Sequence, residues 1–213
     1  KLDIGIVEGI VGLREWDVTI EGVANHAGTT PMADRHDAML AAARFTEMVN
    51  RVATSEPGRQ VGTVGRIQAF PGAPNVVPGK VLCTLELRDL DDRKIQRLYD
   101  VIVAESHKIG ARNGTTFDYH EFVTHESALC DERVRSLIGA SARTLGFTTM
   151  SLPSGAGHDA QNLARVCPMG MIFIPSVGGI SHAPREFSRP QDITNGANVL
   201  LGAVLAMDAT MFA

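Results

Sequence analysis

The apolar residues of this 213-residue chain change their spacing near position 125, and that change limits the folds open to it. Before it, Trp16, Val18 and Ile20 alternate with polar residues, which is the period of a half-buried strand. An apolar stripe at steps of three and four follows, typical of one helix face, and Asp34 is expected to cap that helix. Up to residue 123 the pattern predicts strand, helix, strand, strand, helix, strand, over 16–20, 38–52, 61–70, 81–88, 91–113 and 117–123.

This order is the split β-α-β-β-α-β unit of ferredoxin-like domains, an antiparallel sheet with both helices on one face. From about 125 onward helices and strands alternate, with helices at 132–145, 158–165 and 188–207 and strands at 147–152 and 169–175. The apolar run 169–175 is typical of a strand covered on both faces in a parallel sheet. We therefore expect a fold class of α/β plus α+β. A partial α/β domain (1–13 and 125–213) is interrupted by a ferredoxin-like domain (14–124).

Composition excludes several classes of protein. With 44% hydrophobic residues and a net charge of −4 the chain is expected to fold. No run approaches the roughly 20 apolar residues that cross a bilayer, so we expect no membrane partner. Lys and Arg do not cluster, which argues against nucleic acid as a partner. Three widely spaced cysteines argue against a disulfide framework and favour a cytoplasmic location.

Two familiar catalytic patterns are incomplete. The run from Gly155 to Ala160 matches G-x-G-x-x-A, but no acidic residue occurs in 174–180, where a ribose-binding carboxylate would stand. Ser154 lacks the flanking glycines of the G-x-S-x-G nucleophile turn, because Leu152 and Ala156 occupy those positions. A nucleotide site and a serine hydrolase are therefore disfavoured.

Three histidines lie in loops where ligands commonly bind. His182 follows the most apolar strand, and His158 lies in a glycine-rich bend after the preceding one, so both could face one crevice of an α/β sheet. His26 lies in a tight loop after the first strand of the ferredoxin-like unit. A metal needs three or four protein ligands. On spacing alone, His182 is equally well a structural loop residue, and His158 could simply hydrogen-bond its own turn.

Four sequence runs, in this order, make the chain similar to a known family: GVANHAGTTPM from residue 22, PNVVPG from 74 with LRD at 87–89, SGAGHDA from 154, and GISH from 179. They resemble M20-type metallo-amidohydrolases that cleave ureido groups, namely N-carbamoyl-L-amino acid hydrolases, allantoate amidohydrolases and beta-ureidopropionases. The resemblance covers essentially the whole chain. It implies hydrolysis of a linear amide (ureido) C–N bond, with two divalent ions (Zn, Mn, Ni or Co) as cofactor.

The resemblance also implies roles for individual residues. His182 matches the last metal ligand, and His26 matches a lid histidine that stabilises the oxyanion in the partner subunit's active site. His158 is a further catalytic candidate. A small ureido carboxylate is the expected substrate, and a homodimer through the lid domain is the expected assembly. The residues expected to bind substrate are Asn75, Arg88, Gly155, Gly157 and Arg14.

Other interpretations stay open for several of these residues. Asn75 could serve only its Pro/Gly turn, Arg88 a surface ion pair, and Arg14 a hinge or a salt bridge. The family's other metal ligands and its catalytic Glu precede the lid, and residues 1–13 do not match them. We therefore expect an N-terminally truncated chain that is inactive as it stands. An M20 dipeptidase and a non-catalytic dimerisation module are the alternatives.

Overall fold

The computed structural model describes residues 2–211, which form two compact units. We call residues 12–126 the inserted unit, and residues 1–11 with 127–213 the discontinuous unit. Within the described part of the chain, no helix is both long enough and apolar enough to span a membrane. Each unit is described by itself below.

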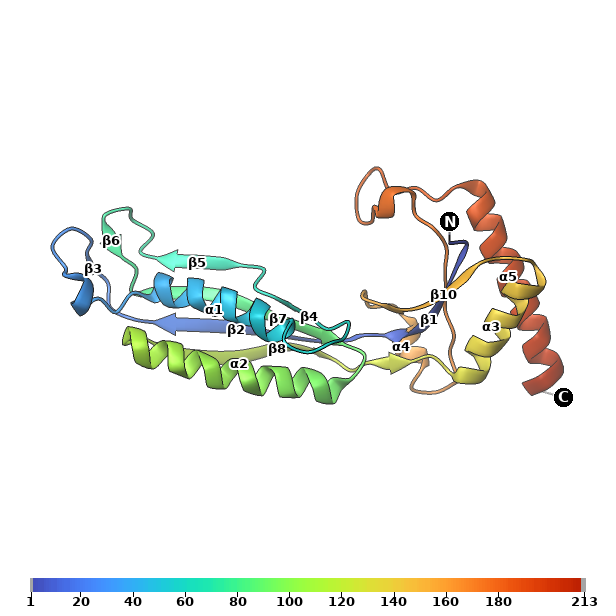
Figure 1. Cartoon of the computed structure of the whole chain (residues 1–213), viewed down its shortest axis with the longest axis horizontal. Coiled ribbons are helices and arrows are strands. Elements are labelled where there is room, and N and C mark those ends of the chain that lie inside the picture. Colours follow the sequence, from blue (N-terminus) through green and yellow to red (C-terminus); the bar gives the residue numbers. More distant parts are fainter. Residues whose placement is uncertain (1, 212–213) are drawn as a thin grey trace. The chain divides into compact units, whose positions relative to one another are not determined.

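The inserted unit is built around five long elements, the strands β2, β7 and β8 and the helices α1 and α2, with shorter segments between them (Figure 1). Its sheet has the order β4-β7-β2-β8 with antiparallel pairing throughout, and β5 extends the β4 edge along β7. The elements are β2 (Gly12–Glu21), β3 (Asn25–His26), η1 (Met32–Asp34), α1 (Ala38–Ala53), β4 (Val61–Thr63), β5 (Ile67–Phe70), β6 (Val76–Val77), β7 (Lys80–Asp89), α2 (Asp92–Asn113) and β8 (Thr116–His125). The long elements follow the order that the spacing predicts.

One core holds this unit together. Alternate residues of β2 and β7 are buried, and α1 and α2 pack over them in a single hydrophobic cluster. Trp16 stacks on Tyr99 of α2, with ring centroids 4.4 Å apart, and Phe45 of α1 meets Phe117 of β8 at 5.6 Å. The other face of the sheet carries charged side chains, among them Arg88. The unit therefore has one apolar and one polar sheet face.

Two local expectations for this unit are wrong. Asp34 lies in the short turn η1, and the cap of α1 is Asp37, whose carboxylate accepts from the backbone N–H of Met39 at 2.9 Å and of Leu40 at 3.1 Å. The expected strand 61–70 is broken into β4 and β5. Thr63 pairs with Glu86 while Ile67 pairs with Cys83, so one residue more lies on this strand than on β7. The extra residue forms a bulge that interrupts the ladder.

The ends of α2 agree with the sequence. The Asp91 carboxylate accepts from the N–H of Arg93 at 2.9 Å, which satisfies one of the free donors of the first turn. Gly114 ends the helix in the left-handed conformation, at φ 63°, and its N–H bonds the carbonyl of Gly110. Glycine suits this position because it takes positive φ without a steric penalty.

The discontinuous unit has β1 at the centre of its sheet. β1 pairs in parallel with β10 and antiparallel with β11 and β9. Helices α3 and α5 pack on one another, and Val134, Ile138 and Val199 form a core with Ile4 and Ile6 of β1. The elements are β1 (Ile4–Ile10), β9 (Ala128–Leu129), α3 (Glu132–Thr144), β10 (Thr149–Ser154), α4 (Ala160–Leu163), β11 (Ile172–Phe173), η2 (Val177–Gly179) and α5 (Pro190–Met211).

Three expectations for this unit need correction. The run 169–175 contributes only β11, which pairs antiparallel with β1 rather than in a parallel sheet. The expected helix 158–165 is the single turn α4. The last helix begins at Pro190, so Ser188, where the sequence predicts its start, lies before it. The spacing of apolar residues does not indicate in which direction the chain enters the sheet after a loop, so it could not predict that β11 is antiparallel to β1.

Candidate functional site

The imidazole of His26 is held by its own loop. Its Nδ1 accepts hydrogen bonds from the backbone N–H groups of Gly28 at 3.0 Å and Thr29 at 3.2 Å, while the residue is exposed. Backbone amides only donate, so Nδ1 must be unprotonated. In the neutral ring the proton is therefore on Nε2, and His26 presents a hydrogen-bond donor to its surroundings.

The structure brings His26 and Asn75 together. β3 and β6 form a small two-stranded sheet in which His26 is opposite Val76, and the N–H of Ala27 donates to the Asn75 carbonyl at 2.9 Å. Asn75 is exposed, and its side-chain amide has no hydrogen-bond partner among the residues that the structure describes. The paired strands β3 and β6 lie at one end of the inserted unit (Figure 1).

Arg88 lies on the polar face of the sheet, opposite the buried Leu85 and Leu87. Its Nε donates to one carboxylate oxygen of Glu86 at 2.8 Å and its Nη2 to the other at 3.0 Å. This pairing lowers the pKa of Glu86 and raises that of Arg88. Glu15 lies opposite Glu86 across the strands, and desolvation together with a hydrogen bond to Glu86 raises the pKa of Glu15. A carboxylate of the chain itself already occupies the guanidinium fork of Arg88.

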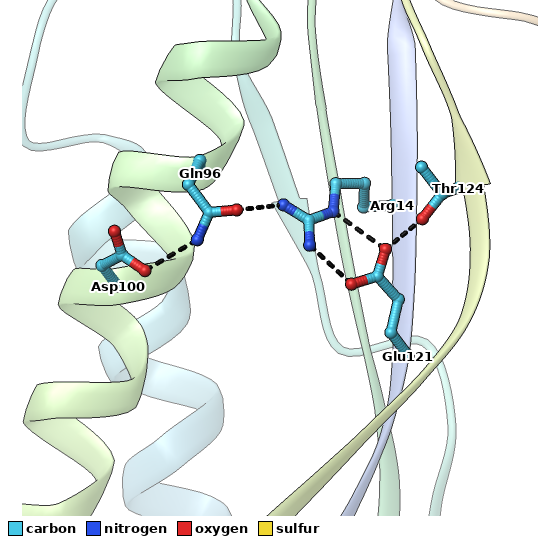
Figure 2. Close-up of polar contacts among 5 residues, drawn as sticks. All are labelled: Arg14, Gln96, Asp100, Glu121 and Thr124. Carbon is cyan, nitrogen blue, oxygen red and sulfur yellow. Dashed lines mark hydrogen bonds and ion pairs between the residues drawn. The ribbon is translucent and has the colours of Figure 1, made fainter.

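Arg14 lies on the other, helix-covered face of the sheet (Figure 2). Its Nε and Nη2 donate to the two carboxylate oxygens of Glu121, at 3.0 and 2.5 Å. Its Nη1 donates to the side-chain oxygen of Gln96 at 2.5 Å. Its Cζ lies 4.8 Å from the ring centroid of Trp16 and 5.7 Å from that of Tyr99. These contacts favour the structural interpretation of Arg14, a salt bridge that joins two strands and a helix, over substrate binding.

His158 and the two glycines form a bend at the end of β10. The buried Ser154 hydroxyl donates to the Ala156 carbonyl at 2.8 Å, so it accepts from Nε2 of His158, 3.0 Å away. His158 thus holds its own bend, which is the simpler of its two interpretations. A side-chain carbon placed at Gly155 would meet no atom within 4 Å, and one at Gly157 would meet only the end of a glutamine side chain. The fold itself does not require glycine at 155.

His182 is exposed, in a loop that continues from η2. It has a positive φ of 54°, uncommon for a residue with a side chain, and its backbone N–H donates to the Glu186 carboxylate at 2.8 Å. Across residues 2–211 the structure contains no group of three or more His, Cys, Asp or Glu side chains arranged to hold a metal ion. Since a protein metal site needs three or four ligands, His182 is at most one member of a larger set.

Two residues of the His26 loop escape sequence reasoning. The Thr30 hydroxyl donates to the His26 carbonyl at 2.7 Å, and the Arg35 guanidinium donates to the carbonyls of Ala27 at 2.6 Å and Thr30 at 3.1 Å. Nothing in the sequence indicates which carbonyls an arginine five residues further along will bind. The only available signal is a Thr and an Arg close behind a candidate histidine.

Comparison with known proteins agrees with the motifs. The model of peptidase family M20/M25/M40 matches residues 16–206. The chain therefore belongs to this family. Within it, the chain falls in the hydantoinase/carbamoylase group of amidohydrolases, as its relatives show.

Two curated relatives and one solved structure illustrate the similarity. The N-carbamoyl-L-amino acid amidohydrolase of Geobacillus stearothermophilus is 38% identical over 203 residues, which is 95% of this chain and 49% of that protein. The allantoate amidohydrolase of Bacillus subtilis is 34% identical, over 93% of this chain and 48% of that protein. A hydantoinase/carbamoylase-family amidase from Burkholderia multivorans superposes with a TM-score of 0.92 at 35% identity, over 96% of this chain and 50% of that chain. The chain spans about half the length of these proteins.

Proposed function

We propose that this chain supplies the lid and part of the catalytic domain of a metal-dependent amidohydrolase. The reaction is hydrolysis of the ureido C–N bond of an N-carbamoyl-L-amino acid or of allantoate. The inserted unit is the lid, and the discontinuous unit belongs to the catalytic domain. The proposal rests chiefly on the His26 loop, where two backbone amides bind Nδ1 and leave Nε2–H as an outward donor. Similarity to amidohydrolases of this group supports the substrate class.

In this proposal His26 acts on the carbonyl oxygen of the ureido group. When water attacks the carbonyl carbon, negative charge develops on that oxygen, and a fixed N–H donor stabilises it more than the ground state. Asn75 lies beside His26, and its exposed amide can bind the substrate's polar groups. Neither residue needs to change its protonation state to do this.

Arg88 is the proposed partner of the substrate carboxylate, because a guanidinium binds a carboxylate through two parallel hydrogen bonds. In the structure Glu86 already forms such a pair with it. A substrate carboxylate must therefore share the guanidinium with Glu86 or displace it. Gly155 and Gly157 are proposed to let the backbone approach the substrate, since the fold gives no steric reason for glycine at 155.

The divalent ions expected of the family do not fit the described residues alone. His182 is the proposed contribution of this chain, and its exposed imidazole has the right chemistry for Zn, Mn, Ni or Co. The remaining ligands are proposed to lie in the half of the relatives that this chain does not match. That half is also the proposed cover for the apolar side of α5, where Leu200, Leu201 and Leu205 are more than half exposed.

A homodimer through the inserted unit is part of the proposal. β8 is the edge strand of the sheet, ten residues long, and among the described residues it pairs only with β2. An edge of this length is suited to pairing with its copy about a two-fold axis. Such pairing would allow His26 to act in the partner subunit's active site.

The test is a turnover assay of the protein encoded by the complete reading frame, loaded with each candidate metal. Ammonia release measures hydrolysis of a ureido substrate, and release of free amino acid measures hydrolysis of a dipeptide. N-carbamoyl-L-amino acids and allantoate are the test substrates, and a dipeptide of the same amino acid is the matched control. We expect turnover of a ureido acid and little of the dipeptide. Turnover of the dipeptide alone would assign the protein to the peptidases, and turnover of neither would contradict the proposal.

A further inference from the structure

We infer that Thr30 and Arg35 are positioning residues that fix the tautomer and the direction of the His26 imidazole. They close the loop from 26 to 30 so that two backbone amides point at Nδ1, which leaves Nε2 as the protonated nitrogen. The catalytic value of this arrangement rests on the proposed function. The tautomer itself does not, so the two are tested separately.

The amides of Gly28 and Thr29 can reach Nδ1 only because the chain turns back on itself after His26. Thr30 makes this turn: its N–H donates to the His26 carbonyl at 3.2 Å, and its hydroxyl donates to the same oxygen at 2.7 Å. Thr30 is buried although its neighbours in the loop are exposed. Loss of that hydroxyl would leave one hydrogen bond in place of two across the turn.

Arg35 joins the two ends of the same turn. Its Nη2 donates to the Ala27 carbonyl at 2.6 Å and its Nε to the Thr30 carbonyl at 3.1 Å. A planar guanidinium holds two acceptors at a fixed separation, and lysine cannot reproduce this geometry with one ammonium group. The two carbonyls that Arg35 binds flank the amides of Gly28 and Thr29. Arg35 therefore sets the direction of the amides that bind Nδ1.

Gly28 lets the ring lie close to the backbone. A side-chain carbon at this position would stand 3.3 Å from Cε1 of His26 and 3.5 Å from Nδ1. The ring would have to move by a few tenths of an ångström to accept it. The backbone of Gly28 does not adopt positive φ, so alanine here disturbs the ring contact without straining the chain.

This arrangement matters because a neutral imidazole has two forms. A ring that is free to rotate and to exchange its proton presents a donor or an acceptor from either nitrogen. A ring bound at Nδ1 by two amides presents only the Nε2–H donor, in one direction. An oxyanion donor is effective when it is oriented before the reaction. The loop orients the Nε2–H of His26 in this way, so no reorientation of the ring is required during the reaction.

The experiment is long-range ¹H–¹⁵N correlation of the histidine rings in the 213-residue chain, at a pH where the rings are neutral. His26 is assigned with a His26→Gln variant. Arg35→Met, Arg35→Lys and Thr30→Val test the positioning residues. Arg66→Met is the matched control, because Arg66 is an exposed arginine of the same unit paired with Asp17. Backbone amide spectra establish that each variant is folded.

The inference predicts an unprotonated Nδ1 and a protonated Nε2 for His26 in the parent chain. In Arg35→Met and Thr30→Val both ring nitrogens should shift towards the average of the two tautomers, and Arg35→Lys should restore less than half of the difference. Arg66→Met should match the parent. A protonated Nδ1 or averaged nitrogens in the parent chain would overturn the inference, as would unchanged rings in folded Arg35→Met. Failure of the ureido assay, with these ring shifts as expected, would count against the proposed function alone.

Discussion

Replacement of Arg14 by Met gives the sharpest test of how the inserted unit is held together. The change keeps most of the aliphatic stem and removes the guanidinium, which binds Glu121 with two hydrogen bonds (Figure 2). The guanidinium also lies over the rings of Trp16 and Tyr99. If Arg14 is structural, the loss should appear as reduced stability of this unit. If Arg14 mainly serves substrate, stability should change little.

The contacts give a magnitude. A cation over an aromatic face contributes about 1 kcal/mol where it is partly desolvated. Hydrogen bonds from a guanidinium to a carboxylate are worth more than neutral ones, but the Arg14 and Glu121 side chains are 21% and 31% exposed, so solvent screening reduces their value to about 1 kcal/mol. Together these amount to a loss of about 2 kcal/mol in the free energy of unfolding. That corresponds to a fall of roughly 1 M in the urea midpoint, for a slope of about 2 kcal/mol per M.

The chain contains a single tryptophan, Trp16, which is buried beneath Arg14. Its fluorescence during urea unfolding therefore reports the inserted unit. Arg66→Met is the control, because its ion pair with Asp17 joins two largely exposed side chains and should be worth under about 1 kcal/mol. The double variant Arg14→Met/Glu121→Gln should lose less stability than the sum of the losses in the two single variants, because both remove the same interaction. An Arg14→Met midpoint no lower than that of the control would refute the structural role.

The same pair has a pH signature. The hydrogen bond from Arg14 lowers the pKa of Glu121 in the folded chain. A carboxyl whose pKa is lowered by folding contributes stability above its unfolded pKa, about 4.3, and that contribution is lost as the pH falls through the lowered value. The stability gap between the parent and Arg14→Met should therefore be widest near neutral pH and should narrow below about pH 4.

Two further predictions concern groups away from this cluster. Glu15→Gln should raise the free energy of unfolding at neutral pH by less than about 1 kcal/mol, because like charges opposite one another on paired strands repel. Folding raises the pKa of Glu15, so the contribution of Glu15 to stability is present at low pH and is lost as the pH rises. The stability gain of Glu15→Gln should therefore vanish in acid. A gain that persisted there would contradict this reasoning. Cys167 is exposed, whereas burial raises the pKa of Cys83 to about 12 and also that of Cys130. A thiol reagent should modify one cysteine of the native chain rapidly and all three in denaturant, and rapid modification of more than one native thiol would be inconsistent with this packing.

Much of the inserted unit is readable from sequence because its determinants are local. Alternation fixes which residues of β2 and β7 are buried, and Asp91 and Gly114 delimit α2 with standard cap chemistry. The break in the strand predicted at 61–70 could not be predicted from the sequence, because a bulge depends on the register against another strand, here β7. Asp34 and Asp37 are equally good caps on composition, and only the backbone path after Pro31 selects between them.

The sequence proposes residues for the candidate site but not their contacts. The motif runs propose His26 and Asn75, but the proximity of the two arises from pairing between segments about fifty residues apart. The partners of Arg14 and Arg88 likewise depend on which strands are neighbours and in what register. In the discontinuous unit, the antiparallel direction of β11 depends on where the chain returns to the sheet. Apolar spacing does not record that path.

The measurement that bears most directly on the account is the turnover of His26→Ala in the complete reading frame, with metal content determined on the same samples. Removal of an oxyanion donor typically lowers kcat by about 10²–10³. We predict a fall of that size on a ureido acid, with bound metal equal to that of the parent. A kcat within a factor of two of the parent's, at equal metal content, would contradict the role given to His26.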